Sequence, residues 1–427
     1  MTDPVLAERR GFLAEFSMLF GKKGSLKEFG ILGALIVIVV AFQIATGGTT
    51  LASGNVINIV QSQSYILLLA IGMVMVIIAG HIDLSVGSVA AFSSVVVAIS
   101  MSDWGLPWGV SVLIGLGLGL AIGAWQGFWV AFVGVPAFIV TLAGMLMFRG
   151  LNQLVGQSRG IGVDRGFVDA LAGYLPEIGP NTGYNNPTLL LGLAAIVVVV
   201  LFELRGRARR LRLGAEVAPV WVLIVRLVLI SAVIVVATLL FASGRPGTSF
   251  PLSGILLVAF VLAYGFLTQR TTLGRHIYAV GGNRRAAELS GVRSRWVDFF
   301  VMANMSVLAS VAGMMWIARS QAAGPADGTG WELDAIAAVF IGGAAVAGGI
   351  GTVAGSIIGG LVMAVLSNGL FAIGTGSDWI QVIKGLVLLV AVAIDVLNKR
   401  QGRFSIIALL QRGLTRGRDR SAAPGAS

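Results

Sequence analysis

The sequence predicts an all-α, polytopic membrane protein with about 10 to 12 transmembrane helices. Of its 427 residues, 56% are hydrophobic and only 11% are charged, and the mean hydropathy is +0.91. A chain of this composition cannot cover folded domains with an ordinary water-facing surface. Several nearly uncharged segments approach the ~20 apolar residues that cross a bilayer: Gly30–Ala45, Ile66–Gly80, Val110–Val133, Thr188–Leu204, Leu252–Leu267 and Leu386–Ile394.

The apolar segments are expected to be helices rather than barrel strands. Ile31–Val40 and Leu223–Leu240 are apolar at nearly every position. A membrane strand would instead alternate apolar and polar residues. The glycine-rich region 335–360 leaves three interpretations open: one broken helix, a re-entrant segment, or two spans.

Positive charge gathers beside the apolar segments. The chain has 30 Lys and Arg against 19 Asp and Glu, a net charge of +11. Because basic residues concentrate in cytoplasmic loops, the clusters predict cytoplasmic sides and leave nucleic-acid binding without support. The clusters comprise Arg9, Arg10, Lys22, Lys23 and Lys27; Arg205, Arg207, Arg209, Arg210 and Arg212; Arg270, Arg275, Arg284, Arg285, Arg293 and Arg295; and the tail from Lys399 to Arg420.

These clusters divide the chain into three parts. Residues 1–29 form a cytoplasmic N-terminal segment, 30–397 the transmembrane domain, and 398–427 a basic cytoplasmic tail that we expect to be disordered. Within the membrane domain we expect an Arg-rich cytoplasmic loop at about 205–218 and a longer one at about 269–296. The opposite loops are poor in basic residues, which predicts an even number of spans with both termini inside.

Several enzyme and cofactor classes are disfavoured. With no cysteine, the chain can form neither a disulfide nor a thiolate metal site. It contains no G-x-x-x-x-G-K-[ST] sequence, and no polar stretch is long enough to fold as a catalytic domain. Gly349–Ala354 fits G-x-G-x-x-A only loosely and lies in an apolar segment. We therefore expect no enzymatic activity, catalytic residue, metal or cofactor in this chain.

Two glycine rows indicate close helix packing. One comprises Gly115, Gly119, Gly123 and Gly127, and the other Gly351, Gly355 and Gly359. Small residues repeated every four positions lie on one face of a helix and let a neighbouring backbone approach.

A few polar residues interrupt the apolar segments. Asp83 and Ser85 lie between two apolar runs with almost no loop, so they are candidates for a gating or path role; helix capping is the structural alternative. Arg226 and Lys384 are expected near span ends, with their charges reaching the headgroups. Arg149, at the end of a span, could have a structural or a functional role.

Four blocks resemble the ribose/xylose-type permeases of bacterial ABC importers. They are Gly80–Ser88, Pro136–Gly150, Thr272–Gly291, and Glu332–Ala338 followed by two glycine-rich pieces. In order and spacing they extend the resemblance from about residue 55 to about residue 395. The resemblance implies the fold of a type II-like ABC importer permease in the bacterial inner membrane.

The third block implies a contact with the motor subunit. In such permeases this loop carries a short coupling helix that docks on the ATP-binding subunit, and the matching stretch here is Asn283–Leu289. We expect Gly281 and Gly282 to give flexibility before it, Ala286 and Ala287 a small packing face, and Gly291 a stop. Arg285 and Glu288 reverse the family's usual signs and form an i,i+3 pair.

The resemblance also implies partners and a substrate class. It predicts a homodimer in membrane lipid, a separate ATP-binding subunit, and an external sugar-binding protein, periplasmic or lipid-anchored. Length and the extra segment Arg205–Leu240 resemble the xylose subgroup most, which favours D-xylose or another pentose. Ribose, galactose and other small sugars remain open, as does transport without ATP.

Overall fold

A computed structural model describes residues 25–215, 217–244 and 247–400, with side chains over 30–393. The expectations for 1–24 and 401–427, most of the predicted N-terminal segment and tail, lie outside the described residues. The described chain is helical, as predicted. Its one sheet is a pair of two-residue antiparallel strands, β1 (Ile161–Gly162) and β2 (Ala322–Ala323).

Eight helices in the described ranges are long and apolar enough to cross a membrane, and two shorter apolar helices bring the number to ten. The long ones are α3 (Ser53–Ile78), α5 (Trp108–Phe128) continued by the π-helix η2 (Trp129–Val133), α6 (Ala137–Val155), α8 (Asn186–Arg212), α9 (Val220–Ala242), α10 (Leu252–Arg270), α13 (Ser294–Ser320) and α15 (Val353–Ala372). The shorter ones belong to α2 (Ser25–Ala45) and α4 (Val86–Ser102).

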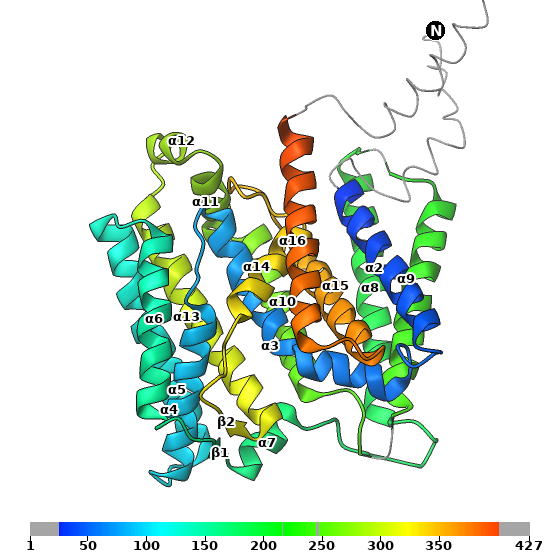
Figure 1. Cartoon of the computed structure of the whole chain (residues 1–427). Coiled ribbons are helices and arrows are strands. Elements are labelled where there is room, and N and C mark those ends of the chain that lie inside the picture. The colour runs from blue at the N-terminus through cyan, green and yellow to red at the C-terminus, as the bar shows by residue number, and fades with distance from the viewer. Residues whose placement is uncertain (1–24, 216, 245–246, 401–427) are drawn as a thin grey trace, which may run out of the picture.

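The remaining helices are shorter or less apolar. They are α7 (Arg165–Ala172), α11 (Thr272–Gly282), α12 (Arg284–Leu289), α14 (Trp331–Ile341) and α16 (Ser377–Arg400). Helices α11 and α12 lie at one end of the bundle, and β1, β2 and α7 lie at the other (Figure 1). These are called the α12 end and the β1–β2 end below.

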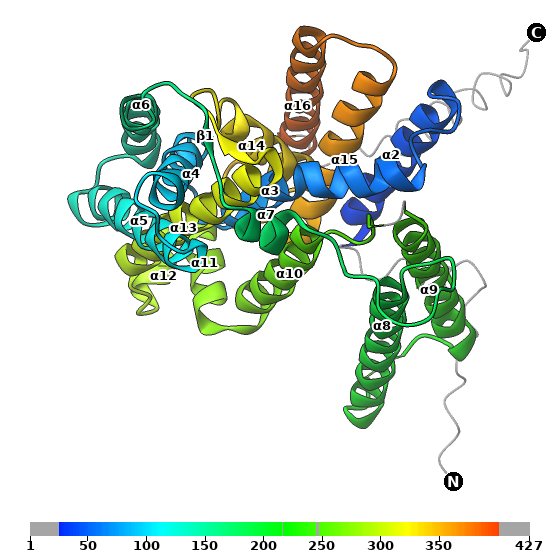
Figure 2. The same ribbon diagram turned by 90° about the horizontal axis from the view of Figure 1, so that it is seen from below.

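The core is built around α3 and α13. In their most apolar windows 78% and 72% of residues are buried, against 11% and 6% in α8 and α9. Figure 2 shows α8 and α9 as a pair standing beside the main bundle. Their apolar side chains are therefore left facing outwards, as expected for a surface in contact with lipid.

Both glycine rows make close contacts, although Gly351 lies in the turn before α15 and not on that helix. A Cβ on Gly123 of α5 would lie 2.6 Å from the Cα of Ala303 on α13, and one on Gly119 would lie 2.9 Å from the Ser306 carbonyl. On α15, a Cβ on Gly359 would lie 2.1 Å from the Ala338 carbonyl of α14. Each row thus sets the distance between two helices.

The glycine-rich region forms two helices rather than one. Helix α14 has 11 residues, which rise only ~16 Å, about half the hydrocarbon thickness. A turn at 342–352 separates it from α15, with positive φ at Gly343, Gly348 and Gly349. The segment before α14 leads from β2 at one end back into the middle of the molecule (Figure 1).

The basic loops contain more helix than we expected. The Arg-rich loop was predicted from about residue 205, but α8 continues to Arg212. Arginine favours helices, and basic side chains in a last turn interact favourably with the helix dipole. The loop at 269–296 likewise contains α11 in addition to the expected short helix α12.

Candidate functional site: helix α12 and the segment before α4

Helix α12 is defined by local hydrogen bonding. Asn283 is its N-cap, and its Oδ1 accepts a hydrogen bond from the Ala286 amide at 3.0 Å. Gly291, with φ of +85°, lies just beyond the helix end, where glycine adopts the left-handed conformation most easily. The structure therefore contains a short helix where the sequence indicated one.

The two alanines of α12 face in different directions. Ala287 is 5% exposed and packs into the core, whereas Ala286 and Arg285 are exposed. Leu289 is 81% exposed, the largest value among the exposed large apolar residues of the described chain. The outer face of α12 thus offers an apolar side chain among charged ones.

Gly281 and Gly282 do not form a flexible lead into α12. They are the last two residues of α11, and a Cβ on Gly281 would lie 1.6 Å from the Ile78 carbonyl at the end of α3. The Gly349 amide donates a hydrogen bond to the same carbonyl at 2.8 Å. Gly281 is therefore needed for close backbone packing.

An ion pair joins α12 to the membrane bundle. The Arg284 guanidinium donates to both carboxylate oxygens of Asp298 on α13, at 2.8 and 2.9 Å. His81, in the segment between α3 and α4, is 2.8 Å from Asp298 Oδ1 through its Nε2. The hydrogen bonds to Asp298 raise the pKa of Arg284, which keeps it charged. One buried carboxylate thereby links three segments.

The predicted pair between Arg285 and Glu288 does not form between these described residues. Glu288 instead accepts a hydrogen bond from Ser294 Oγ at 2.6 Å, at the start of α13. Sequence reasoning assigned no role to Asp298 and did not pair it with Arg284. A signal was present, because Asp298 is an acidic residue directly before the apolar run of α13.

A cavity lies beside this ion pair. Its volume is about 450 Å³, and its lining includes His81, Arg284, Asp298 and the turn before α6 at 134–138. The cavity separates the α12 region from the start of α6. Small movements of α12 could therefore occur without an immediate clash with α6.

Asp83 and Ser85 form a buried polar turn. Asp83, only 1% exposed, accepts through Oδ1 from the Ser85 amide at 2.8 Å and from Ser85 Oγ at 2.7 Å. Gln126 of α5 donates to Ser85 Oγ at 2.8 Å. Ser85 is the N-cap residue of α4, yet its side chain makes no capping hydrogen bond. A gating or path role for Asp83 and Ser85 stays a prediction.

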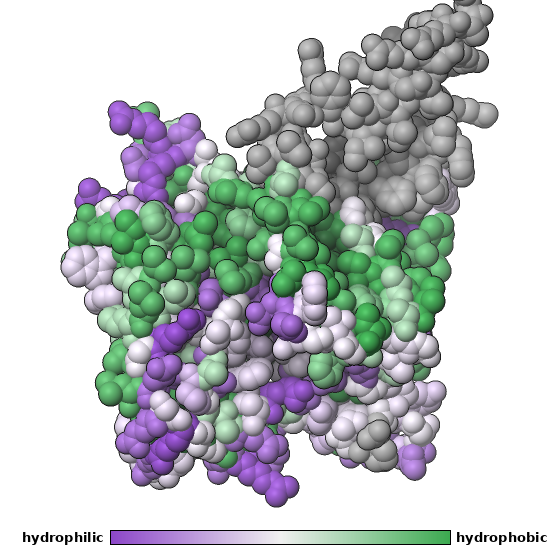
Figure 3. Space-filling view, in the orientation of Figure 1, coloured by the Kyte–Doolittle hydropathy of each residue, from purple (hydrophilic) through white to green (hydrophobic). Residues whose placement is uncertain are grey.

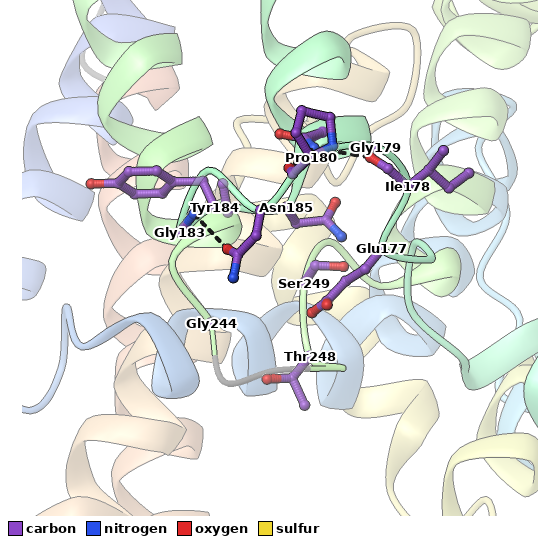
Figure 4. Close-up of a pocket in the computed structure, with 13 residues that line it drawn as sticks. Glu177, Ile178, Gly179, Pro180, Gly183, Tyr184, Asn185, Gly244, Thr248 and Ser249 are labelled. Atoms are coloured by element: carbon purple, nitrogen blue, oxygen red, sulfur yellow. Dashed lines mark hydrogen bonds between the residues drawn. The ribbon is translucent and has the colours of Figure 1, made fainter.

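The β1–β2 end carries a second cavity that the sequence did not suggest. It measures about 430 Å³ and is bordered by residues 177–186 and 242–249 (Figure 4). Glu177 accepts a hydrogen bond from the Gly247 amide at 3.1 Å, and Asn185 donates to the Pro176 carbonyl at 3.1 Å. The bond of Glu177 connects the loop before α8 to the loop after α9, and the bond of Asn185 lies within the loop before α8.

No group of three or more His, Asp or Glu side chains within the described ranges could hold a metal ion. The ionisable residues at both ends instead form hydrogen bonds and ion pairs.

Comparison with known proteins identifies the family. Residues 55–392 match the family described as "Branched-chain amino acid transport system / permease component". The chain belongs to this permease family. It is accordingly a multi-pass protein of the inner membrane, as the sequence predicted.

Several relatives of this permease are named for sugars. It is 39% identical to the xylose transport system permease protein XylH of Haemophilus influenzae, over 89% of this chain and 99% of the relative. The protein of the same name from Escherichia coli is 37% identical over 89% and 94%, respectively. The ribose import permease protein RbsC of Escherichia coli is 33% identical over 90% and 97%. No solved structure matches the permease.

Proposed function

We propose that this chain is the membrane-spanning subunit of an ATP-driven importer that takes up D-xylose or another pentose. The observation that carries the proposal is the 39% identity with a xylose permease over 89% of the chain. The ribose permease, at 33%, favours ribose as the second candidate. In this proposal ATP is bound and hydrolysed by a separate subunit, and this chain needs no cofactor of its own.

The outer face of α12 supports a motor partner. Leu289 and Ala286 are exposed on a helix whose other side is fixed by Ala287 and by the ion pair of Arg284 with Asp298. A partner that moves α12 would act on α13 through this pair. We infer that Asn283, Arg285, Ala286 and Leu289 contact the ATP-binding subunit, and that Glu288 positions the helix.

The remaining parts of the assembly follow from this assignment. Two copies of the chain would surround a common path in membrane lipid, with the α12 end in the cytoplasm. A sugar-binding protein would deliver the sugar at the β1–β2 end. The basic residues at the end of α8, Arg209, Arg210 and Arg212, support this orientation because such residues favour the cytoplasmic side.

Uptake of radiolabelled D-xylose into proteoliposomes tests the proposal. The vesicles would hold this chain, its ATP-binding subunit and its sugar-binding protein, with or without ATP on the α12 side. We expect uptake that requires both ATP and the binding protein, and faster uptake of D-xylose than of ribose or galactose. Uptake by this chain alone would contradict the ATP-driven mechanism, and uptake of ribose only would contradict the xylose assignment.

A bulky substitution on α12 tests the motor contact. Because Ala286 is exposed, A286W adds a large ring to the docking face without disturbing the core. We expect uptake to fall roughly 5- to 150-fold, since an overpacked contact costs about 1–3 kcal/mol. L213W is the matched control, because Leu213 is 72% exposed at the end of α8, outside α12. Equal losses in both variants would contradict a specific role of α12.

A further inference from the structure

Four charged side chains surround a cavity in the middle of the bundle. Arg149 of α6, Glu332 and Asp334 of α14, and Lys384 of α16 border a space of about 470 Å³. Glu332 is the most buried of them, with a side chain 8% exposed. Charges at this depth are costly in lipid, so they are expected where protein or water replaces the lipid.

The backbone around the cavity is also unusual for a membrane segment. Residues 324–330 return from β2 to mid-height as irregular chain, and α14 begins there after Gly330, which has φ of +80° (Figure 1). Non-helical backbone at this depth is tolerated when it is buried in protein or borders a water-filled cavity. The N-terminus of a half-helix also presents the positive end of the helix dipole.

Two buried polar atoms at this site have no hydrogen-bond partner in the described chain. Lys384 Nζ lies 2.5 Å from Asp334 Oδ1, a close pair, whereas Arg149 Nη2 is 3.9 Å from Glu332 Oε1. Arg149 Nη2 and Glu332 Oε2 are buried without a hydrogen-bond partner in the described chain. Buried polar groups are normally paired, so this donor and this acceptor need a partner that the described chain does not supply.

The charge balance indicates what kind of ligand fits. Two cations and two carboxylates make the site neutral overall, so an ion would upset the existing pairs. A hydroxyl group both donates and accepts, and can therefore satisfy Arg149 and Glu332 at once. A neutral molecule with several hydroxyl groups meets this requirement, and the volume lies in the usual range for small-ligand pockets.

The hydropathy of the surface is consistent with a site that does not face lipid. In Figure 3 hydrophilic residues interrupt the apolar surface at mid-height, over the region where Figure 1 shows α14 and the lower part of α16. Lys384 was expected to reach the headgroups, but it pairs with Asp334 instead. Arg226, for which the same was expected, pairs with Glu203 of α8 at 3.0 Å.

We propose that the cavity bordered by Arg149, Glu332, Asp334 and Lys384 is the site through which the sugar passes within this chain. The proposal rests on the proposed function and adds the contact residues. Arg149 and Glu332 bind sugar hydroxyls, while the pair of Lys384 and Asp334 holds α16 against α14. As it crosses the membrane, the sugar replaces its hydrogen bonds to water with hydrogen bonds to these groups.

Thiol labelling tests whether the cavity contains water and sugar. The native chain has no cysteine, so a single cysteine can be labelled without background. Leu388 borders the cavity one turn beyond Lys384, whereas Leu386, on the same helix and 56% exposed, is not among the lining residues. In the assembled transporter we expect a water-soluble thiol reagent to modify L388C but not L386C, and D-xylose to slow the modification.

Charge removal tests the contact itself. We expect E332Q to lower ATP-dependent uptake about tenfold or more, because a hydrogen bond to a charged group is lost. Binding-protein-stimulated ATP hydrolysis should stay within about twofold, since α12 is untouched. E203Q is the matched control, because Glu203 pairs with Arg226 outside the cavity.

The outcomes separate this proposal from the proposed function. If L388C is as unreactive as L386C, or if sugars leave its reaction rate unchanged, the cavity is not the sugar path. Unchanged uptake by E332Q, or equal losses of uptake and ATP hydrolysis, would also overturn it. If the unmutated assembly transports none of the sugars, the proposed function fails, and the labelling still decides whether the cavity is aqueous.

Discussion

Single residues in this permease act mainly by joining segments that are distant in sequence. Asp298 is the clearest example, because its carboxylate holds both Arg284 of α12 and His81 of the α3–α4 segment. Asp83 lies two residues after His81 and holds the turn before α4. Movement of α12 can therefore reach the start of α4 through one side chain.

The substitution D298N tests this connection. It removes the charge that binds Arg284, and breaking a buried ion pair costs up to about 3–5 kcal/mol, less here because Arg284 is 42% exposed. We expect reduced ATP-dependent uptake in D298N and in R284Q, with the double variant no worse than the more impaired single one. A double-mutant cycle on uptake rates measures this. R209Q is the control, since Arg209 is exposed on α8, outside α12 and outside the pair; additive losses would argue against a direct link.

Among the elements, the pairing of α5 with α13 depends on glycine. Gly115, Gly119, Gly123 and Gly127 face α13, and their missing side chains let the two backbones touch. The central helix α13 is then enclosed by α3, α4 and α5, which explains why so much of it is buried. The stripe has a packing role, as its spacing predicted.

We expect G123L to disrupt this helix pair and G117L to leave it intact. A Cβ on Gly123 would lie 2.6 Å from Ala303, whereas nothing lies within 4 Å of one on Gly117 of the same helix. Overpacking typically costs about 1–3 kcal/mol, and backbone contact places G123L at or above that range. Thermal unfolding in detergent should show a clearly lower midpoint for G123L only. Similar midpoints for both variants would mean that α5 can move away at little cost.

At the scale of the whole molecule, the two ends differ in chemistry. The α12 end carries a helix with an exposed leucine and a nearby ion pair, and the β1–β2 end carries the loops of the second cavity. Between them, α14 and its charged cavity occupy the middle (Figure 1). In the proposed assembly, this layout would place the motor contact, the sugar path and the delivery surface in one line across the membrane.

Cysteine labelling of vesicles tests this orientation. Leu289 at the α12 end is 81% exposed, and Ile178 at the other end is 64% exposed. We expect a membrane-impermeant thiol reagent to label I178C in right-side-out vesicles and L289C only in inside-out vesicles, because the proposed orientation places the α12 end in the cytoplasm. The reverse pattern would invert the proposed assembly. Detergent-solubilised protein, in which both sites should react, serves as the control.

The sequence by itself determined the class of the protein, and its resemblance to a known family located α12. Continuous apolar runs require helices in a bilayer, and a stop near Gly291 depends only on neighbouring residues. The glycine stripes could also be found from sequence, since their spacing is that of one helix face. Such signals depend only on nearby residues, so they can be recognised without knowledge of the fold.

Only the tertiary structure decided which charges meet. His81 and Asp298 are 217 positions apart in the sequence. Lys384 of α16 pairs with Asp334 of α14, and helix α15 lies between them in the sequence. The sequence placed Lys384 at the headgroups because position along a helix does not reveal what the neighbouring helix presents. An ion pair depends on the packing angle and register of two helices, and these are set by contacts spread over the whole bundle.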